Sequence, residues 1–379
     1  MKIAQFGTIE PTALYSFGWY ALLSPTRTAR RGEDMNDLRP EDILEHGFDA
    51  HRGNLLGMQP LVRAADYASE DTLTARLSQY TEIAAQKGWL NPRTVVVWPE
   101  YVGTWLAAAG EWPAVYHARR LNRAMLLLAA HHLLPFARQV TAAREKDRIA
   151  ASLFRLKAPD MARRYQAVFG GLARQYSVTM VAGSILLPSP EVENGQVMAG
   201  VGPLHSVSAV FGPDGLAAAN LVRKVIPTTD ELPFVAPAPV AQLPVFDTPA
   251  GRLGVLICAD SWYPAPYQQL KTQGVELIAV PSSITTPGLW DRPWRGYNGA
   301  SMPADVDPGD VGHLTEGQAW RKYALAARIG SSGATHGMNV FLHSTLWDIS
   351  GDCGQALAVS DGSVTQSSGA GAAILNLWL

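Results

Sequence analysis

The sequence predicts an α/β protein, because short apolar strands alternate with segments of helical periodicity along most of the chain. Three runs rich in aliphatic and β-branched residues indicate buried strands, at Thr94–Trp98, Leu253–Ile257 and Val275–Val280. Residues 111–176 are mostly helical in composition. With 379 residues, 47% of them hydrophobic, the chain can bury a large core, as one large domain or two.

Charge and cysteine content narrow the class of protein. The net charge of −2 shows no excess that would favour nucleic acid or an anionic membrane as partner. Two cysteines, Cys258 and Cys353, cannot form a disulfide framework in a chain of this length, and they exclude a zinc site built on CxxC pairs. We therefore expect a reducing, cytoplasmic location, with one of the two thiols available as a nucleophile.

Residues 1–50 form a leader without a clear periodic pattern, and its polar part is expected to wrap the surface. Within it, Ala13–Leu23 is apolar and aromatic, but it is short and follows Glu10 and Pro11, unlike a secretory signal. It is interpreted as a docking or amphipathic segment, with a membrane-surface anchor as the alternative. Residues 51–379 are assigned to one domain.

The first strand and helix follow the leader. Asn54–Met58 is predicted to be a short strand. Ser69–Lys87 places apolar or small residues at offsets of three and four, which is typical of an amphipathic helix. Ser69 is suited to cap its start, and Gly88 is suited to end it.

The strand Thr94–Trp98 ends in Pro99-Glu100-Tyr101. A carboxylate at the end of a buried strand indicates a functional group, and the alternative is a glutamate in a solvated loop. The helical region that follows contains Ala114–Val140, predicted to break at Pro135, and a second helix at Ala162–Tyr176.

His131 and His132 are adjacent in the helical region. Neighbouring histidines on a helix point in different directions, so surface or packing roles are favoured over a metal site. We therefore expect no metal at this pair.

Strand signals return after the helices. Thr179–Leu187 is predicted to be one strand, and His205–Phe211 alternates as a half-buried strand. The sequence Gly-Pro-Asp-Gly at 212–215 is typical of a tight turn, and Leu216–Val222 returns as the partner strand. This hairpin delivers Lys224 at its end.

The strand Leu253–Ile257 runs directly into Cys258 and then into Ala-Asp-Ser-Trp-Tyr-Pro. This abrupt change to polar residues indicates a strand end directed at a site. The alternative is a structural thiol, because free cysteine is among the most buried residue types. Cys353 instead lies in a Gly-containing loop and is not expected to be the nucleophile.

The C-terminal part continues the alternation of strand and helix. Residues 285–312 form a long loop carrying Trp290, Trp294 and Tyr297, and loops of this length are usually functional. The remaining predicted elements are a helix at Tyr267–Lys271, a helix at Gln318–Ile329, a strand at Met338–His343, a hairpin turn at Val359–Ser363 and a strand at Ala373–Leu379.

Three motifs resemble the nitrilase, or carbon–nitrogen hydrolase, superfamily. They are VVVWPEY around Glu100, GPDG…NLVRKVIPTTDE around Lys224, and GVLICADSWYP around Cys258. The resemblance covers about residues 53–365, with VAGSILL and GVELIAVPSS as supporting matches. It implies a four-layer α-β-β-α sandwich, no cofactor, and homo-oligomers that associate through the helices near the catalytic cysteine.

The three residue types also make chemical sense together. A free thiol has a pKa of about 8.5 and needs a base at neutral pH, which Glu100 can supply. Lys224 and the backbone N–H of Ala259 can stabilise the oxyanion formed when Cys258 attacks a carbonyl carbon. The resemblance assigns Glu231 as the family's second glutamate, orienting Lys224 or the substrate.

Aromatic residues are candidate walls of the substrate pocket. They are Tyr101, Trp262 and Trp290, with Trp294 and Tyr297 beside them, and the alternative for each is a core or interface aromatic.

The sequence departs from the family pattern next to the cysteine. Ala259 replaces the Trp of the Trp-Glu pair typical of nitrilases, and no arginine follows shortly after Cys258, as carbamoyl-amide hydrolases commonly have. Amide hydrolysis on a small molecule is therefore expected, with nitrile hydrolysis or acyl transfer as alternatives. A non-enzymatic binding protein of the same fold would be expected to lack a triad member. Asp260 is assigned either to amide recognition or to capping the next turn.

A second departure is an extra helical part within 111–165, which is expected to cover the site rim or an intersubunit surface.

Overall fold

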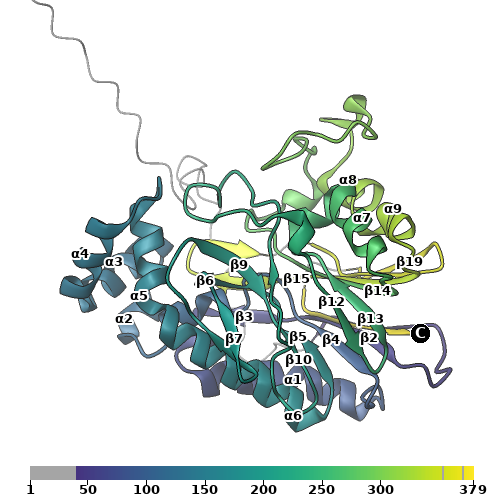
Figure 1. Cartoon of the computed structure of the whole chain (residues 1–379), viewed down its shortest axis with the longest axis horizontal. Helices are drawn as coiled ribbons and strands as arrows, with labels where there is room; N and C mark the ends of the chain where they lie inside the picture. The colour runs from purple at the N-terminus through teal and green to yellow at the C-terminus, as the bar shows by residue number, and fades with distance from the viewer. Residues whose placement is uncertain (1–39, 352–353, 369–370) are drawn as a thin grey trace, which may run out of the picture.

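A computed structural model describes residues 40–351, 354–368 and 371–379. Two six-stranded sheets pack face to face, and helices cover the outer face of each sheet (Figure 1). The predicted four-layer α-β-β-α sandwich is confirmed by this arrangement.

The first sheet has a parallel centre in which β2, β4 and β5 are neighbours. Strand β20 pairs antiparallel with β2, and β1 pairs parallel with β20 at the edge. In sheet order the strands are β1 (Asp42–His46), β20 (Ala373–Trp378), β2 (Asn54–Gln59), β4 (Thr94–Val97), β5 (Thr179–Val181) and β10 (Val210–Phe211).

The second sheet is parallel from β13 to β15 and antiparallel at both ends. Its strands, in order, are β12 (Val245–Thr248), β13 (Gly251–Val255), β14 (Leu277–Ser282), β15 (His336–Phe341), β18 (Leu357–Ser360) and β19 (Ser363–Gln366).

Strand alternation divides the core into two layers. Leu55 and Val95 pack with residues of the second sheet, whereas Leu56 and Val96 pack against the helices outside the first. Gly57 marks a close approach of the two sheets, because an added Cβ would lie 2.5 Å from the sulfur of Met338.

The predicted helix at Ser69–Lys87 is confirmed as α1 (Glu70–Gln86). The Ser69 hydroxyl accepts a hydrogen bond from the Thr72 N–H at 3.1 Å and so caps the helix start. Gly88 follows with φ +74°, the left-handed conformation that commonly ends a helix.

The prediction of one helix at Gln318–Ile329 is wrong, because the backbone of Ala324 leaves the helical region and divides it into two helices.

The other helices flank the two sheets (Figure 1). The first sheet is covered by α1, α5 (Arg148–Tyr165), the π-helical turn η4 (Gln166–Gly170) and α6 (Gly171–Tyr176); the second by α7 (Pro264–Thr272), α8 (Glu316–Tyr323) and α9 (Leu325–Arg328).

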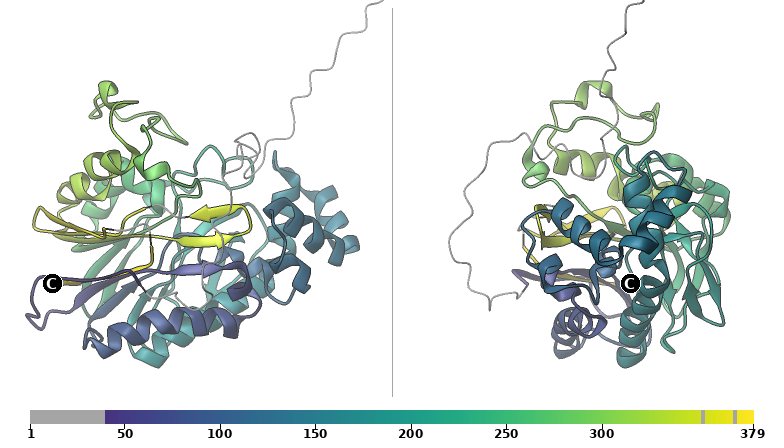
Figure 2. Two further views of the ribbon diagram at one scale, coloured as in Figure 1. Left: turned by 180° about the vertical axis from the view of Figure 1, so that it is seen from behind. Right: turned by 90° about the vertical axis from the view of Figure 1, so that its left-hand side faces the viewer.

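Residues 111–147, the helical insert, project from one end of the sandwich (Figure 2). The predicted helix at Ala114–Val140 is three helices: α2 (Pro113–Tyr116), α3 (Leu121–His131) and α4 (Leu133–Ala142). Pro135 does not interrupt the helix, because it lies in the first turn of α4, where an N–H group would have no intrahelical acceptor. The break falls at His132, and the next helix begins at Arg148 rather than Ala162.

The predicted strand Thr179–Leu187 is divided between two sheets. After β5 the chain turns at Gly183, with φ +66°, where an added Cβ would collide with the carbonyl oxygen of Pro99. His205–Phe211 divides in the same way, into β9 and β10. Strand β9 (Leu204–Ser208) lies between β6 (Ile185–Pro188) and β11 (Val222–Arg223) in a three-stranded sheet, whereas β5 and β10 pair in the first sheet.

The leader prediction is wrong for its last residues, because β1 is an edge strand of the first sheet. The apolar segment Ala13–Leu23 lies outside the described residues, so its docking or anchoring role stays a prediction. No helix within the described ranges is long and apolar enough to cross a bilayer.

Short elements complete the chain. The loop predicted at 285–312 contains the 3-10 turns η7 (Leu289–Asp291) and η8 (Pro308–Asp310) and an isolated β-bridge from Pro293 to Thr315. Strands β3 (Leu61–Arg63), β16 (His343–Leu346) and β17 (Ile349–Gly351) form one small sheet, and β7 (Glu191–Glu193) with β8 (Gln196–Met198) forms a hairpin.

Candidate active site

Three strand ends bring Glu100, Lys224 and Cys258 together. Glu100 follows β4, Lys224 follows β11, and Cys258 follows β13. The Lys224 Nζ lies 2.7 Å from Glu100 Oε1, and the charges of both residues act on the pKa of the Cys258 thiol. The three side chains predicted from separate motifs therefore lie within one site.

Backbone contacts fix the turn that carries Glu100. The Glu100 N–H donates to the carbonyl of Ser282, the last residue of β14, at 3.2 Å. The next N–H, of Tyr101, donates to the Ser184 hydroxyl at 2.8 Å. Tyr101 has φ +63°, so the chain reverses direction immediately after the carboxylate.

Lys224 is 1% exposed and lies between two carboxylates. Its Nζ donates to Glu100 at 2.7 Å and to Glu231 Oε2 at 2.6 Å. Glu231 is held in turn by the Thr228 N–H at 2.7 Å and by the Tyr101 hydroxyl. Tyr101, predicted as a pocket wall, thus contacts Glu231, and Glu231 contacts Lys224.

Cys258 has φ +49° and opens the 3-10 turn η6 (Cys258–Trp262). A left-handed backbone at a residue other than glycine is strained and is concentrated at functional sites. The Cys258 Sγ lies 3.8 Å from the Ser283 carbonyl oxygen, and the residue is 7% exposed. Ala259 is the second residue of the turn, where an N–H has no intrahelical acceptor. Cys353 lies outside the described residues.

Burial and charge set the protonation states of the site. Burial raises the pKa of Glu100 to about 7, although the charge of Lys224 opposes the rise. Burial and the charge of Glu100 raise the pKa of the Cys258 thiol. Burial alone would lower the pKa of Lys224, but the charges of Glu100 and Glu231 outweigh it and raise that pKa. At neutral pH the site thus holds a charged lysine, a neutral thiol and a carboxyl group that can exchange its proton.

The Asp260 side chain bonds backbone N–H groups of two segments, including that of Ile257 at the start of η6, and amide recognition stays a prediction. It is fully buried, and its carboxylate accepts from the N–H groups of Ile226 at 2.7 Å, Val225 at 3.0 Å and Ile257 at 3.3 Å. Burial raises its pKa to about 6, against the charge of Lys224. The side chain ties the residues after Lys224 to the turn that carries Cys258.

The aromatic residues of the long loop pack into one cluster with Trp262. Trp262 stacks on Trp294 with ring centroids 5.8 Å apart and meets the edge of Trp320 at 4.9 Å. Trp290 makes an edge contact with Phe341 at 5.4 Å. These contacts match the alternative of core aromatics, and a role as pocket walls stays a prediction.

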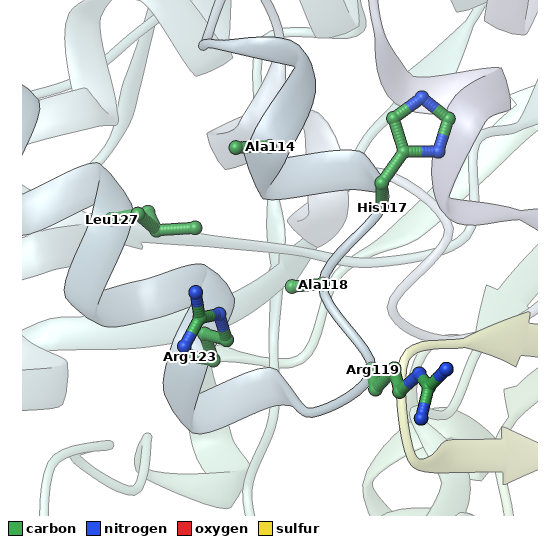
Figure 3. A pocket seen from close by; sticks show the side chains of 6 residues that line it. All are labelled: Ala114, His117, Ala118, Arg119, Arg123 and Leu127. Carbon is green, nitrogen blue, oxygen red and sulfur yellow. The ribbon is translucent and has the colours of Figure 1, made fainter.

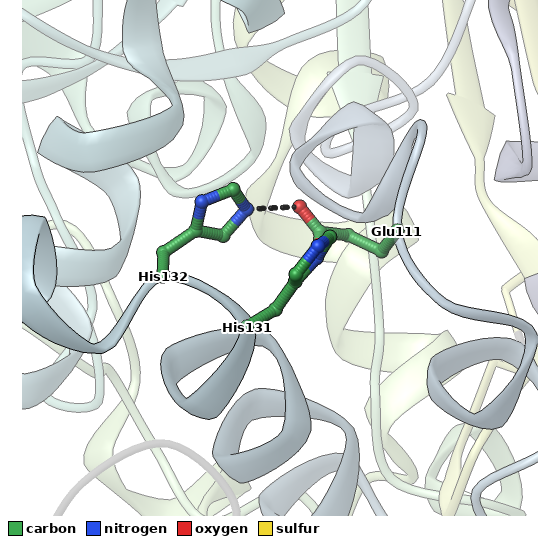
Figure 4. A group of neighbouring side chains, drawn as sticks. All are labelled: Glu111, His131 and His132. Atoms are coloured by element: carbon green, nitrogen blue, oxygen red, sulfur yellow. Dashed lines mark hydrogen bonds and ion pairs between the residues drawn. The ribbon is translucent and has the colours of Figure 1, made fainter.

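A second polar cluster lies in the helical insert (Figure 4). Contrary to the sequence prediction, both histidines reach one carboxylate: His131 Nδ1 lies 2.7 Å and His132 Nε2 2.8 Å from Glu111. They converge because His132 has left the helical conformation. Lys157 donates to Glu111 Oε1 at 2.6 Å, so the carboxylate already has a cationic partner. We interpret the four residues as a clamp between the insert and α5.

Comparisons with known proteins match most of the chain. A family model described as carbon–nitrogen hydrolase matches residues 55–352. A deaminated glutathione amidase of Yersinia enterocolitica is 47% identical over 47 residues, which cover 12% of this chain and 16% of the relative. Nitrilase 3 of Arabidopsis thaliana is 30% identical over 115 residues, covering 27% of this chain and 33% of the relative. The chain thus matches only a minor share of these two relatives.

Two further proteins have wider coverage. A human omega-amidase is 28% identical over 183 residues, covering 43% of this chain and 61% of the relative. The solved amidase from Nesterenkonia sp. AN1, carrying the acetamide moiety of fluoroacetamide on its active-site cysteine, superposes with a TM-score of 0.54. It is 13% identical, and the superposition covers 88% of this chain and 93% of that chain, which is a likeness of fold.

Proposed function

We propose that this chain, which belongs to the carbon–nitrogen hydrolase family, hydrolyses a small-molecule amide to a carboxylic acid and ammonia. The observation that carries the proposal is the buried Lys224, bonded to Glu100 and Glu231 beside the strained Cys258. Burial of these charges is unfavourable, and buried charged groups with shifted pKa values are concentrated at catalytic sites. Strained backbone such as that of Cys258 is concentrated there as well.

The first half of the reaction forms a thioester. Glu100 accepts the thiol proton as the Cys258 sulfur attacks the amide carbonyl carbon. The negative charge moves to the carbonyl oxygen, where the Lys224 ammonium and the Ala259 N–H stabilise it. The carbon–nitrogen bond then breaks, and Glu100 returns the proton to the departing nitrogen. Ammonia leaves, and the acyl group stays on sulfur.

The second half regenerates the enzyme. Glu100 takes a proton from water, and the oxygen attacks the thioester carbonyl carbon. The carbon–sulfur bond breaks, the carboxylic acid leaves, and Cys258 recovers its proton. A pKa of about 7 suits Glu100 to act as base and acid in alternate steps.

The surrounding residues act indirectly in this proposal. Glu231 holds Lys224 in place, and the Tyr101 hydroxyl holds Glu231. Trp262 and Trp290 are proposed to wall the substrate pocket from the aromatic cluster. No cofactor takes part in any step.

A nitrile is the second candidate substrate, because nitrilase 3 of Arabidopsis thaliana is among the relatives. Ala259 favours an amide, since the Trp-Glu pair of nitrilases is missing after Cys258. A third outcome is acyl transfer, in which an amine instead of water takes the acyl group from the same thioester.

A matched pair of substrates tests the choice. One side chain is offered as amide and as nitrile, and the release of ammonia and carboxylic acid is followed for each. We expect the higher kcat/KM for the amide. A higher value for the nitrile would overturn the substrate assignment, and an amide product formed with an added amine would indicate acyl transfer.

We also propose a homo-oligomer that associates through the helices near Cys258, such as α7. Light scattering of the purified chain tests this, and a monomer mass across micromolar concentrations would contradict it.

A further inference from the structure

The helical insert carries an uncompensated positive charge. Its sequence holds six basic residues and three acidic ones. The acidic side chains are all engaged: Glu111 in the clamp, Glu145 with Arg155, and Asp147 as the cap of α5, accepting from the Ala150 N–H at 3.0 Å. The overall charge of −2 therefore conceals a local cationic region.

The basic side chains of the insert are exposed. Within the part of the chain that the structure describes, none of them forms an ion pair. They are Arg119, Arg120, Arg123, Arg138, Arg144 and Lys146.

Two of these arginines line a cavity of about 480 Å³ between α2 and α3 (Figure 3). Arg119 comes from the connection between the helices and Arg123 from the first turn of α3, and His117, which follows α2, also lines the cavity. Guanidinium groups are the side chains best suited to bind phosphate oxygens through paired hydrogen bonds. Arg119 and Arg123 are thus suited to contact phosphate groups at the rim of this cavity.

The helical insert also exposes three leucines. Leu126 is 68% exposed, Leu133 63% and Leu134 73%. Arg123, which lines the cavity, precedes Leu126 by three residues, so the two share one side of α3. Helix α4, which carries the other two leucines, buries none of its side chains in the described structure.

We propose that the helical insert docks on an anionic lipid surface. Arg119 and Arg123 contact headgroup phosphates at the rim of the cavity, and Leu126, Leu133 and Leu134 enter the boundary between headgroups and acyl chains. Helices with a basic face and exposed leucines bind membrane surfaces in this way.

Charge disfavours a second copy of the chain as the occupant. A two-fold contact would place the same patch against itself and bring the unpaired arginines of two inserts together. The clamp supports docking, because Glu111 and Lys157 fix the junction of α3 and α4 to α5 and so hold the leucines in place.

The test is co-sedimentation of the full chain with vesicles of phosphatidylcholine alone or with added phosphatidylserine. We expect binding to the anionic vesicles only. R119Q/R123Q should weaken it roughly 25-fold, at about fivefold per arginine. Leu126→Gln/Leu133→Gln/Leu134→Gln should weaken it roughly tenfold or more. The matched controls Arg52→Gln and Val201→Gln, exposed residues outside the insert, should bind as the unaltered chain does.

Each variant is also assayed for amide turnover without vesicles. We expect unchanged turnover, which would show that the variant is folded. Absence of binding by the unaltered chain, or equal binding by the insert variants, would overturn the proposal. If soluble glycerol phosphate abolished vesicle binding completely, the ligand of the insert would be a free phosphate compound and not a lipid. Binding to polyglutamate that survives the leucine changes would indicate an acidic protein, and a fall in oligomer mass in the leucine variant would indicate a second copy.

Discussion

Lys224 Nζ lies 2.7 Å from Glu100 Oε1, and both side chains are 1% exposed. A buried ion pair is costly to desolvate, and removing one partner leaves the other charge uncompensated. In this site the lysine serves two carboxylates, because Glu231 lies on its other side at 2.6 Å. The Lys224–Glu100 pair is thus fixed in position, although the burial of its charges is unfavourable.

Replacing Lys224 should affect the transition state more than substrate binding. Lys224→Met is expected to lower kcat by about 100- to 1,000-fold, because one oxyanion donor is lost. Steady-state kinetics measure the effect, and circular dichroism checks the fold. Lys87→Met, at an exposed lysine that follows α1, is the control and should leave kcat unchanged. A change confined to KM would contradict the role of Lys224.

The pH dependence should follow Glu100. Its carboxyl group must be ionised to accept the thiol proton, and burial raises its pKa to about 7. We therefore expect kcat/KM to fall as pH decreases below about 7 and to level off above it. The profile is measured with a neutral amide, so that the substrate does not titrate. A rate independent of pH between about 5 and 8 would refute Glu100 as the base.

The strand ends that carry Glu100, Lys224 and Cys258 could be predicted, because a buried apolar run followed by one polar residue is a local signal. The contacts of Asp260 could not be predicted, because its carboxylate oxygens accept from N–H groups 34 and 35 residues earlier in the chain. The same applies to His131 and His132: regular helix geometry separates them, and only the break at His132 brings both to Glu111.

Other differences also arise from long-range packing. Thr179–Leu187 has the composition of one strand, but contact of Gly183 with Pro99 divides it between two sheets. Strand β1 forms because β20, from the end of the chain, offers it an edge, which no local pattern indicates.

Asp260 should act as a positioning residue. Asp260→Asn keeps the size but places an amide against three backbone N–H groups, so the segment after Lys224 should shift. We expect a fall in kcat of about tenfold or more with little change in KM, because about 1–3 kcal/mol of buried hydrogen bonding is lost. Asp247→Asn, an exposed residue of β12, is the control. Equal kcat in both variants would contradict the positioning role.

Glu111 should stabilise the fold in a pH-dependent way. Burial would raise its pKa, but hydrogen bonds from Lys157, His131 and His132 outweigh this and lower it. A lowered pKa in the folded state gives stability that is present above the unfolded value of 4.5 and is lost as pH falls through the lower folded value.

Glu111→Gln is thus expected to reduce the free energy of unfolding by about 1–3 kcal/mol at pH 7. Urea titrations of the variant and the unaltered chain should converge at pH values below the folded pKa. Glu193→Gln, in the exposed hairpin, serves as control. A difference that does not shrink with falling pH would contradict the clamp.

The thioester on Cys258 is the central claim, and intact-mass spectrometry of the enzyme quenched during amide turnover tests it most directly. We expect an added mass equal to the acyl group in place of the thiol hydrogen, located on the peptide that contains Cys258. Cys353→Ala should retain both the adduct and most of the turnover, whereas Cys258→Ala should lose both. An adduct on Cys353, or wild-type turnover in Cys258→Ala, would contradict the account.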